Sequence, residues 1–117
     1  MNRATMIPIA PAQTRGEGWT RACRVDEIPV LGARVVRSAH GNIAVFRNSE
    51  DEIFALHDKC PHKGGPLSQG IVHGRKVTCP LHSWNIGLED GNAVAPDTGR
   101  ARSFPVKVEN GEVYLQI

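Results

Sequence analysis

The chain has 117 residues, of which 40 % are hydrophobic and 22 % are charged, with a formal net charge of +2. This size predicts one domain with a modest core, and the composition excludes a wholly disordered chain. Basic residues are scattered and aromatic residues make up only 5 % of the chain, so we expect no nucleic-acid partner. There is no membrane-length apolar run. Pro8 and Pro11 interrupt the apolar residues near the start, which argues against a signal peptide, so we expect a cytoplasmic protein without membrane contact.

The first 16 residues are rich in Pro, Ala and Thr without periodicity. They predict a flexible N-terminal arm at 1–16, ahead of a single domain at 17–117. Short runs rich in branched side chains then alternate with clusters of turn-forming residues. These runs cover 19–23, 34–37, 43–47 and 52–56. Such a pattern is typical of an antiparallel β-sheet.

Residues from about 58 to 97 are crowded with glycine and proline, which indicates a loop-rich subdomain in which a functional site would lie. A helical turn is expected near 65–67 and a hairpin tip at His73. Strand-like residues return at 104–108 and 113–117, on either side of Asn110-Gly111, which is a strong hairpin signal. The predicted fold class is all-β, with an antiparallel β-sandwich as the base domain and the loop-rich subdomain inserted into it.

The chain contains three cysteines, and this odd number does not suggest a disulfide framework. Cys23 lies on an expected strand and is interpreted as a buried, inert thiol. The other two are each followed closely by a histidine, in Cys60-Pro61-His62 and in Cys79-Pro80-Leu81-His82. Each loop therefore offers one thiolate and one imidazole, and the two loops can converge on a single metal site.

Two cysteines and two histidines suit either a structural zinc ion or a Rieske-type [2Fe–2S] cluster. Zinc sites commonly use Cys-x₂₋₄-Cys knuckles or a His-x₃₋₅-His pair, whereas here both loops are mixed. In a Rieske centre two thiolates bind one iron and two imidazoles bind the other, and mixed loops supply that arrangement directly. A redox-silent, zinc-binding interaction module remains the alternative.

The order Cys-x-His, sixteen residues, Cys-x-x-His resembles the pattern of the Rieske [2Fe–2S] family, over about 19–117. Within that family the chain looks most similar to the small subunit of cytoplasmic NAD(P)H-dependent nitrite reductase, an oxidoreductase. The stretches that carry this likeness are 58–68, 79–84 and 95–99 with 104–106. The resemblance implies a Rieske iron–sulfur fold and one [2Fe–2S] cluster per chain. The cluster ligands that it implies are Cys60, His62, Cys79 and His82.

The same resemblance implies a role in nitrate assimilation, as the electron-transfer subunit that supports reduction of nitrite to ammonium. The expected partner is a large subunit that carries flavin, sirohaem and an iron–sulfur cluster. The isolated chain is expected only to carry electrons, and no catalytic residue is assigned. The alternative within the family is a Rieske ferredoxin that passes electrons to a ring-hydroxylating dioxygenase.

The reduction potential is expected in the lower part of the Rieske range of roughly −150 to +300 mV. High-potential members of the family carry an extra cysteine in each loop, joined as a disulfide, and the matching positions here are Gly65 and Leu81. Those members also place a serine two residues after the second histidine, where this chain has Trp84. Fewer hydrogen-bond donors near the sulfurs stabilise the reduced state less, although Ser83 remains available as a donor.

Several other residues near the two loops have two interpretations. Trp84 is either an electron route or partner contact, or part of the core. Four basic residues either steer an acidic partner or form an ordinary solvated surface; they are Lys59, Lys63, Arg75 and Lys76. Three further histidines are expected to serve packing, loops or turns rather than to bind metal, and these are His40, His57 and His73.

Overall fold

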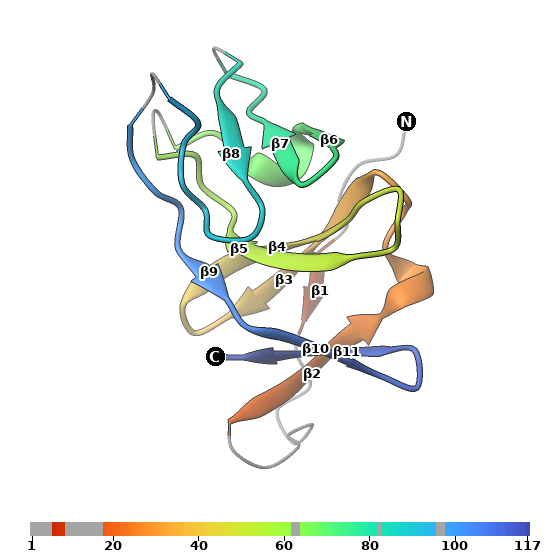
Figure 1. The fold of residues 1–117 in the computed structure, drawn as a ribbon. Helices are drawn as coiled ribbons and strands as arrows, with labels where there is room; N and C mark the ends of the chain where they lie inside the picture. The colour runs from red at the N-terminus through yellow and green to blue at the C-terminus, as the bar shows by residue number, and fades with distance from the viewer. Residues whose placement is uncertain (1–5, 9–17, 62–63, 82, 96–97) are drawn as a thin grey trace.

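The computed structural model describes residues 6–8, 18–61, 64–81, 83–95 and 98–117 (Figure 1). These residues form three small sheets. The central sheet has the strand order β1-β3-β4-β5-β9, and all its pairings are antiparallel except the parallel pairing of β1 with β3. Its strands are β1 (Met6–Pro8), β3 (Gly32–Ser38), β4 (Gly41–Arg47), β5 (Ile53–His57) and β9 (Ser103–Phe104).

A second antiparallel sheet has the order β10-β11-β2, and a third has the order β6-β7-β8. The second sheet consists of β10 (Val106–Glu109), β11 (Glu112–Gln116) and β2 (Trp19–Arg24), and the third of β6 (Ile71–His73), β7 (Lys76–Thr78) and β8 (Asn85–Gly87). Two 3₁₀ turns complete the described elements, η1 (Val25–Glu27) and η2 (Leu67–Gln69). The all-β prediction is confirmed, and the described residues contain no helix long and apolar enough to cross a membrane.

The strands expected at 19–23, 34–37, 43–47 and 52–56 are present as β2, β3, β4 and β5. Of the segment expected as an arm, only Met6–Pro8 is described, and it pairs with Val35–Arg37 of β3. The prediction for the rest of 1–16 falls outside the described residues. The expected helical turn near 65–67 is η2, which begins at Leu67.

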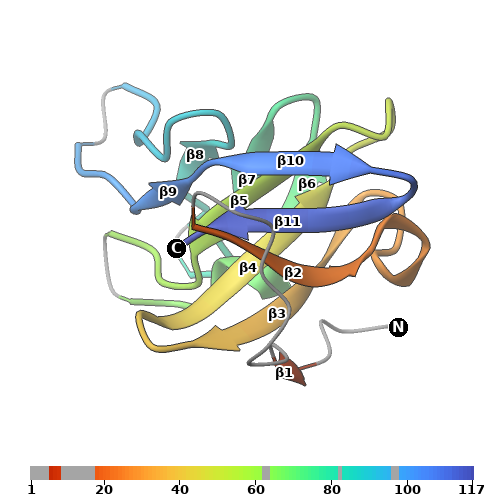
Figure 2. The ribbon, with the colours of Figure 1, turned by 90° about the horizontal axis from the view of Figure 1, so that it is seen from below.

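The central sheet separates two hydrophobic cores, because successive side chains of a strand point to opposite faces. On one face Ile43 and Val45 of β4 pack with Val113 and Leu115 of the second sheet. Figure 2 shows the two sheets face to face, with the second sheet crossing in front of the central one. This is the sandwich of the base domain, and its core includes Cys23.

On the other face of β4, Ala44 and Phe46 point toward the third sheet. Val77 and Ile86 of that sheet pack into the same core, as do Cys60 and Cys79. Figure 1 shows this part of the chain, residues 58–97, as a separate lobe above the sandwich. The base domain therefore provides the floor on which the cysteine-bearing loops rest.

Pro105 marks the place where the chain leaves one sheet for the other. Phe104 pairs with Ala55 in the central sheet, and Val106 pairs with Leu115 in the second sheet. The sequence predicted one strand at 104–108, but a proline cannot donate to a ladder and so favours a break between two strands. The hairpin prediction at Asn110-Gly111 is confirmed, and both residues have the positive φ of a type I′ turn, at 52° and 75°.

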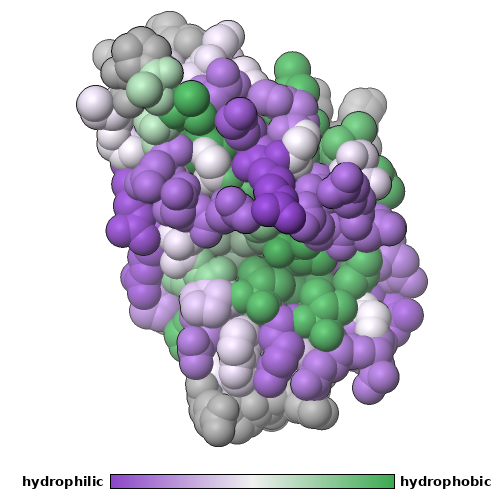
Figure 3. Space-filling model, in the orientation of Figure 1, coloured by the Kyte–Doolittle hydropathy of each residue, from purple (hydrophilic) through white to green (hydrophobic). Residues whose placement is uncertain are grey.

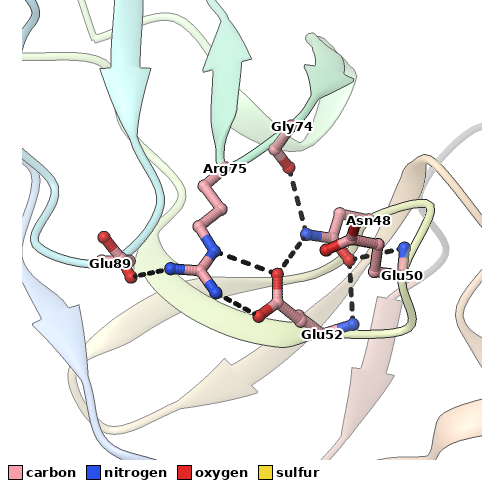
Figure 4. A network of polar contacts seen from close by, with 6 residues as sticks. All are labelled: Asn48, Glu50, Glu52, Gly74, Arg75 and Glu89. Atoms are coloured by element: carbon pink, nitrogen blue, oxygen red, sulfur yellow. Dashed lines mark hydrogen bonds and ion pairs between the residues drawn. The ribbon is translucent and has the colours of Figure 1, made fainter.

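A polar belt joins the lobe to the base (Figure 4). Asn48, only 2 % exposed, directly follows β4. Its Nδ2 donates to Glu52 Oε1 (2.8 Å) and to the carbonyl of Gly74 (3.1 Å). Arg75 then donates to Glu52 Oε2 (2.6 Å) and to Glu89 Oε2 (2.8 Å). The tip of the β6–β7 hairpin is thereby attached to the β4–β5 turn.

Below this belt the surface becomes apolar, as the space-filling view shows (Figure 3). A shallow hollow of about 280 Å³ lies there between β5 and β10, lined in part by Ile53, Phe54 and Val106. It lies on the side of the sandwich and is not lined by either cysteine-bearing loop.

Candidate metal centre

Two loops carry the cysteines of interest, and each loop begins where a strand ends. The first loop runs from the end of β5 to η2 and contains Cys60. The second connects β7 to β8 and contains Cys79. Both cysteine side chains are buried, at 3 % and 2 % exposed, and both belong to the core of the lobe.

The first loop is a tight turn closed by its own backbone. The amide of Cys60 donates to the carbonyl of Gly65 (2.7 Å), and the amide of Gly64 donates back to the carbonyl of Cys60 (2.8 Å). Gly64 has φ +73°, in the region that favours glycine. At its base, Asp58 accepts hydrogen bonds from the amide (2.7 Å) and the hydroxyl (2.9 Å) of Ser68. These contacts hold the loop at both ends.

The second loop is closed by a hydrogen bond from the amide of Cys79 to the carbonyl of Trp84 (2.7 Å). The amide of Leu81 donates to the Cys79 sulfur at 3.4 Å. Ser83 adopts φ 57°, an uncommon conformation for a residue other than glycine. Trp84 is partly buried and packs against the core of the lobe, which supports the packing interpretation of this residue.

The two loops touch at Gly65, which lies against the second loop. A Cβ atom added there would lie 2.9 Å from Leu81 Cδ1 and 3.4 Å from the sulfur of Cys79. Any side chain at position 65 would therefore push against Leu81. The pair that occupies the positions of the disulfide in high-potential relatives is thus a glycine packed beneath a leucine.

The two thiols lie within reach of each other. Burial raises the pKa of Cys79 to about 11, the amide of Leu81 lowers that pKa, and the side chain of Cys60 raises it further. A thiol with such a pKa keeps its proton at neutral pH, and a bound metal displaces that proton. Two converging sulfurs, one of which already accepts a backbone N–H, fit a pair of thiolate ligands to one iron.

The remaining predicted ligands, His62 and His82, lie outside the described residues, as does Lys63. The other histidines are placed. His73 is the last residue of β6 and pairs with Lys76, so the hairpin tip expected at His73 lies one residue later, at Gly74-Arg75. Its Nε2 is 2.7 Å from the hydroxyl of Thr78. His40 is exposed in the β3–β4 turn, and His57 ends β5.

Cys23 lies in the other core and is 1 % exposed, so the prediction of a buried thiol is confirmed. Burial raises its pKa to about 12, and the charge of Glu27 adds to the rise.

Three residues that hold the lobe and the first loop were not recognised from the sequence, namely Asn48, Asp58 and Ser68. Asn48 and Ser68 stand out only as polar side chains that are buried, and the sequence alone does not show burial.

Comparisons with known proteins agree with this geometry. The family model of the Rieske [2Fe-2S] domain matches residues 18–105. The ferredoxin component of the naphthalene 1,2-dioxygenase/salicylate 5-hydroxylase systems of a Ralstonia species is 32 % identical over 105 residues, covering 86 % of this chain and 97 % of its own length. The anthranilate 1,2-dioxygenase ferredoxin subunit of Burkholderia cepacia is 41 % identical over 76 residues, covering 64 % of this chain and 69 % of its own length.

Solved structures give the same fold. A chain from the complex of oxygenase and ferredoxin in carbazole 1,9a-dioxygenase superposes with a TM-score of 0.75 at 27 % identity, covering 86 % of this chain and 94 % of its own. A Mycobacterium tuberculosis chain assigned as an NADH-dependent nitrite reductase small subunit superposes with a TM-score of 0.74 at 26 % identity, covering 83 % and 92 %. The family and these ferredoxin relatives imply a Rieske-type [2Fe–2S] cluster as the cofactor. From its matched domain and its paired cysteine loops, the chain belongs to the Rieske [2Fe–2S] family.

Proposed function

We propose that this chain is the ferredoxin component of a ring-hydroxylating oxygenase system, and that Cys60, His62, Cys79 and His82 hold its cluster. The convergence of two buried thiols on two packed loops carries the cluster assignment, and the identity to dioxygenase ferredoxin components supports the role. The chain also spans 97 % of the length of the Ralstonia ferredoxin component. By contrast, it covers only 23 % of the 4beta-methylsterol monooxygenase of Methylococcus capsulatus.

The cluster, when bound, accepts and releases one electron at a time. In the proposed site Cys60 and Cys79 supply two negative charges, and the imidazoles of His62 and His82 bind without adding charge. Two thiolates would balance the charge of an oxidised cluster, whereas four thiolates would make the site negative before any electron is added. A site with two histidine ligands would therefore take up an electron at a higher potential.

The chain stabilises that added charge through its backbone. The amide of Leu81 points at the Cys79 sulfur, where it favours negative charge. The side chain of Leu81 lies over Gly65, beside the same sulfur. Positions 65 and 81 cannot form a disulfide, so we expect a potential in the lower half of the Rieske range.

A nitrite reductase small subunit is the second candidate. The Mycobacterium tuberculosis structure favours it, as do the stretches 58–68 and 79–84 quoted above. In that role the chain would work beside a large subunit with flavin, sirohaem and an iron–sulfur cluster, in the reduction of nitrite to ammonium. The identity to ferredoxin components over nearly their whole length favours the first candidate.

The ligand assignment is tested by iron and sulfide analysis together with electron paramagnetic resonance of the reduced protein. The purified chain should contain about two irons and two sulfides and give a Rieske-type signal. Cys60→Ser and Cys79→Ser should each lose most of the iron, the sulfide and the resonance signal. Cys23→Ala is the matched control and should keep all three. A zinc ion in place of iron, or a cluster retained in either serine variant, would contradict the assignment. The potential is then measured by redox titration, and a value in the upper half of the range would contradict our expectation.

The partner is tested by mixing the reduced protein with each of two acceptors from the same organism. One is a ring-hydroxylating oxygenase component, and the other is the large subunit of nitrite reductase. Oxidation of the chain coupled to substrate hydroxylation supports the first candidate. Oxidation of the chain coupled to ammonium formation, with no hydroxylation, would instead support the nitrite reductase small subunit and contradict the first candidate.

A further inference from the structure

A group of basic side chains surrounds the first cysteine loop. It consists of Lys59, Arg100, Arg102 and His40, all exposed, and is called the basic face below. Arg102 and His40 both lie against Phe104. The guanidinium carbon of Arg102 is 4.8 Å from the centre of that ring, and the rings of His40 and Phe104 are 6.3 Å apart.

The basic face continues from Phe104 up to the first loop. The amide of His57 donates to the carbonyl of Arg102 (2.7 Å), and the amide of Lys59 donates to the carbonyl of His57 (2.7 Å). The side chain of Lys59 lies beside Gly64, in the turn that follows Cys60. The backbone of residues 57–59 therefore links the strand end at Arg102 to Lys59, which lies beside the first cysteine loop.

Arg100 extends the basic face along the opposite edge of this loop. Its neighbour Gly99 lies against Pro61, since a Cβ atom at Gly99 would be 3.0 Å from Pro61 Cβ. Pro61 is the residue between Cys60 and His62. The Arg100 side chain itself donates to the carbonyl of Asp90 (3.1 Å).

The positive charges of this face are not neutralised by carboxylates among the described residues. Asp58 is next to Lys59 in the sequence, but both of its carboxylate oxygens accept hydrogen bonds from Ser68. The Asp90 carboxylate accepts from the amide of Asn92. Several cations elsewhere are paired, as in Arg21 with Glu112, Arg24 with Asp26, Arg47 with Asp51, Arg75 with Glu52 and Glu89, and Lys107 with Glu109. Among the described residues, Arg34, Arg37 and Lys76 also have no carboxylate partner, but they do not belong to the basic face.

Unpaired charge of one sign, beside the site where electrons leave, steers a partner of opposite charge. We infer that the basic face is the docking surface for an acidic face on the protein that exchanges electrons with this chain. This inference rests on the proposed electron-transfer function and names the chemistry of its partner. It also changes the set of basic residues expected to steer a partner. Lys59 stays in the set, whereas Arg75 leaves it because it is already held by Glu52 and Glu89.

The test measures one-electron oxidation of the reduced, cluster-loaded protein in a stopped-flow instrument, at low and at moderate salt. The probes are ferricyanide, which carries three negative charges, and tris(phenanthroline)cobalt(III), which carries three positive charges. In each case one electron passes from the cluster to the probe metal. The variants are Lys59→Glu and Arg102→Glu, and the matched control is Arg24→Glu, which makes the same charge change on the base.

At low salt we expect each variant at the basic face to be oxidised about three- to tenfold more slowly by ferricyanide and faster by the cobalt probe. The control should change neither rate of oxidation by more than about 1.5-fold. Raising the salt from about 20 to about 200 mM should remove most of the difference, because the Debye length falls below about 10 Å. Equal effects of the control and the variants, or effects that do not depend on salt, would overturn the inference.

The same variants are then compared with the wild type against whichever acceptor protein accepts electrons. If the variants transfer electrons to this acceptor more slowly, in the same order as with ferricyanide, the acceptor has an acidic docking face. Unchanged electron-transfer rates would overturn the docking inference and leave the proposed function in place. If neither acceptor is reduced by the wild type, the proposed function fails, and the probes still decide whether the basic face controls access. Lys59→Gln and Arg102→Gln replace any glutamate variant whose iron content falls, with about half the effect expected.

Discussion

The three cysteines show that burial alone does not distinguish a ligand from an ordinary core residue. Cys23, Cys60 and Cys79 are all at most 3 % exposed. Cys23 lies on β2 among the apolar side chains of the sandwich. Cys79, by contrast, accepts a hydrogen bond from the Leu81 amide and lies beside the thiol of Cys60. The neighbours of each sulfur, rather than its depth, set its chemistry.

Because of the Cys23 thiol, the free energy of unfolding should fall as the pH rises into the alkaline range. Its pKa is raised to about 12 in the fold, chiefly by burial, so the folded state keeps a proton that the unfolded chain releases above about pH 9. This contribution to the free energy of unfolding is complete below pH 9 and is lost as the pH rises toward 12. Between pH 8 and 10.5 the wild type should lose about 2 kcal/mol more than Cys23→Ala.

Urea unfolding of both proteins at the two pH values measures this difference. Equal losses in the two proteins would show that Cys23 titrates in the fold as it does in the unfolded chain.

At the scale of elements, the position of the lobe depends on one buried amide. Asn48 Oδ1 accepts from the amides of Glu50 (3.0 Å) and Glu52 (2.9 Å), while Nδ2 reaches Gly74 in the β6–β7 hairpin. The same side chain therefore shapes the β4–β5 turn and holds the lobe. Arg75 makes the second connection, but its ion pairs are exposed to solvent, where such pairs contribute little.

Asn48→Ala should accordingly reduce the free energy of unfolding by about 2 to 3 kcal/mol, because buried backbone groups lose their partners. The exposed neighbour Ser49 provides the control, since Ser49→Ala removes no hydrogen bond given by the structure. Arg75→Ala should have a smaller effect than Asn48→Ala. Urea unfolding measures all three, and an Asn48→Ala protein as stable as the Ser49→Ala control would show that the belt does not hold the lobe.

At the scale of the whole molecule, the chain has two cores that differ in their relation to the cofactor. The core of the lobe contains both Cys60 and Cys79, whereas the sandwich core contains neither. A cluster that joins the two loops adds binding free energy to the folded lobe. The sandwich, which packs on the far face of β4, gains this stabilisation only indirectly.

Removal of iron by a chelator should therefore loosen one part of the molecule more than the other. We expect faster amide hydrogen exchange in β6, β7 and β8, with much smaller changes in β2, β4 and β11. Exchange followed by mass spectrometry compares the cluster-loaded protein with the stripped protein. A uniform increase in all strands would instead show that the two cores unfold as one unit.

The alternating pattern of the base domain was readable from the sequence because neighbouring strands pair locally. The runs around Val36, Val45 and Leu56 each place alternate side chains on opposite faces, and Asn110-Gly111 specifies the closing turn. The third sheet was harder to predict, because β6, β7 and β8 have only three residues each. Such short strands carry too few residues for a period to be recognised.

The sequence by itself determined the all-β class, the hairpins and the two Cys-x₁₋₂-His loops, because these depend on residues close together in the chain. Tertiary structure decided everything that depends on distant segments meeting. It placed Gly65 beneath Leu81, attached Gly74 to Asn48, divided the strand at Pro105 between two sheets, and brought His40 against Phe104. Each of these contacts joins residues that no local sequence pattern relates to one another, so only packing of the whole chain establishes them.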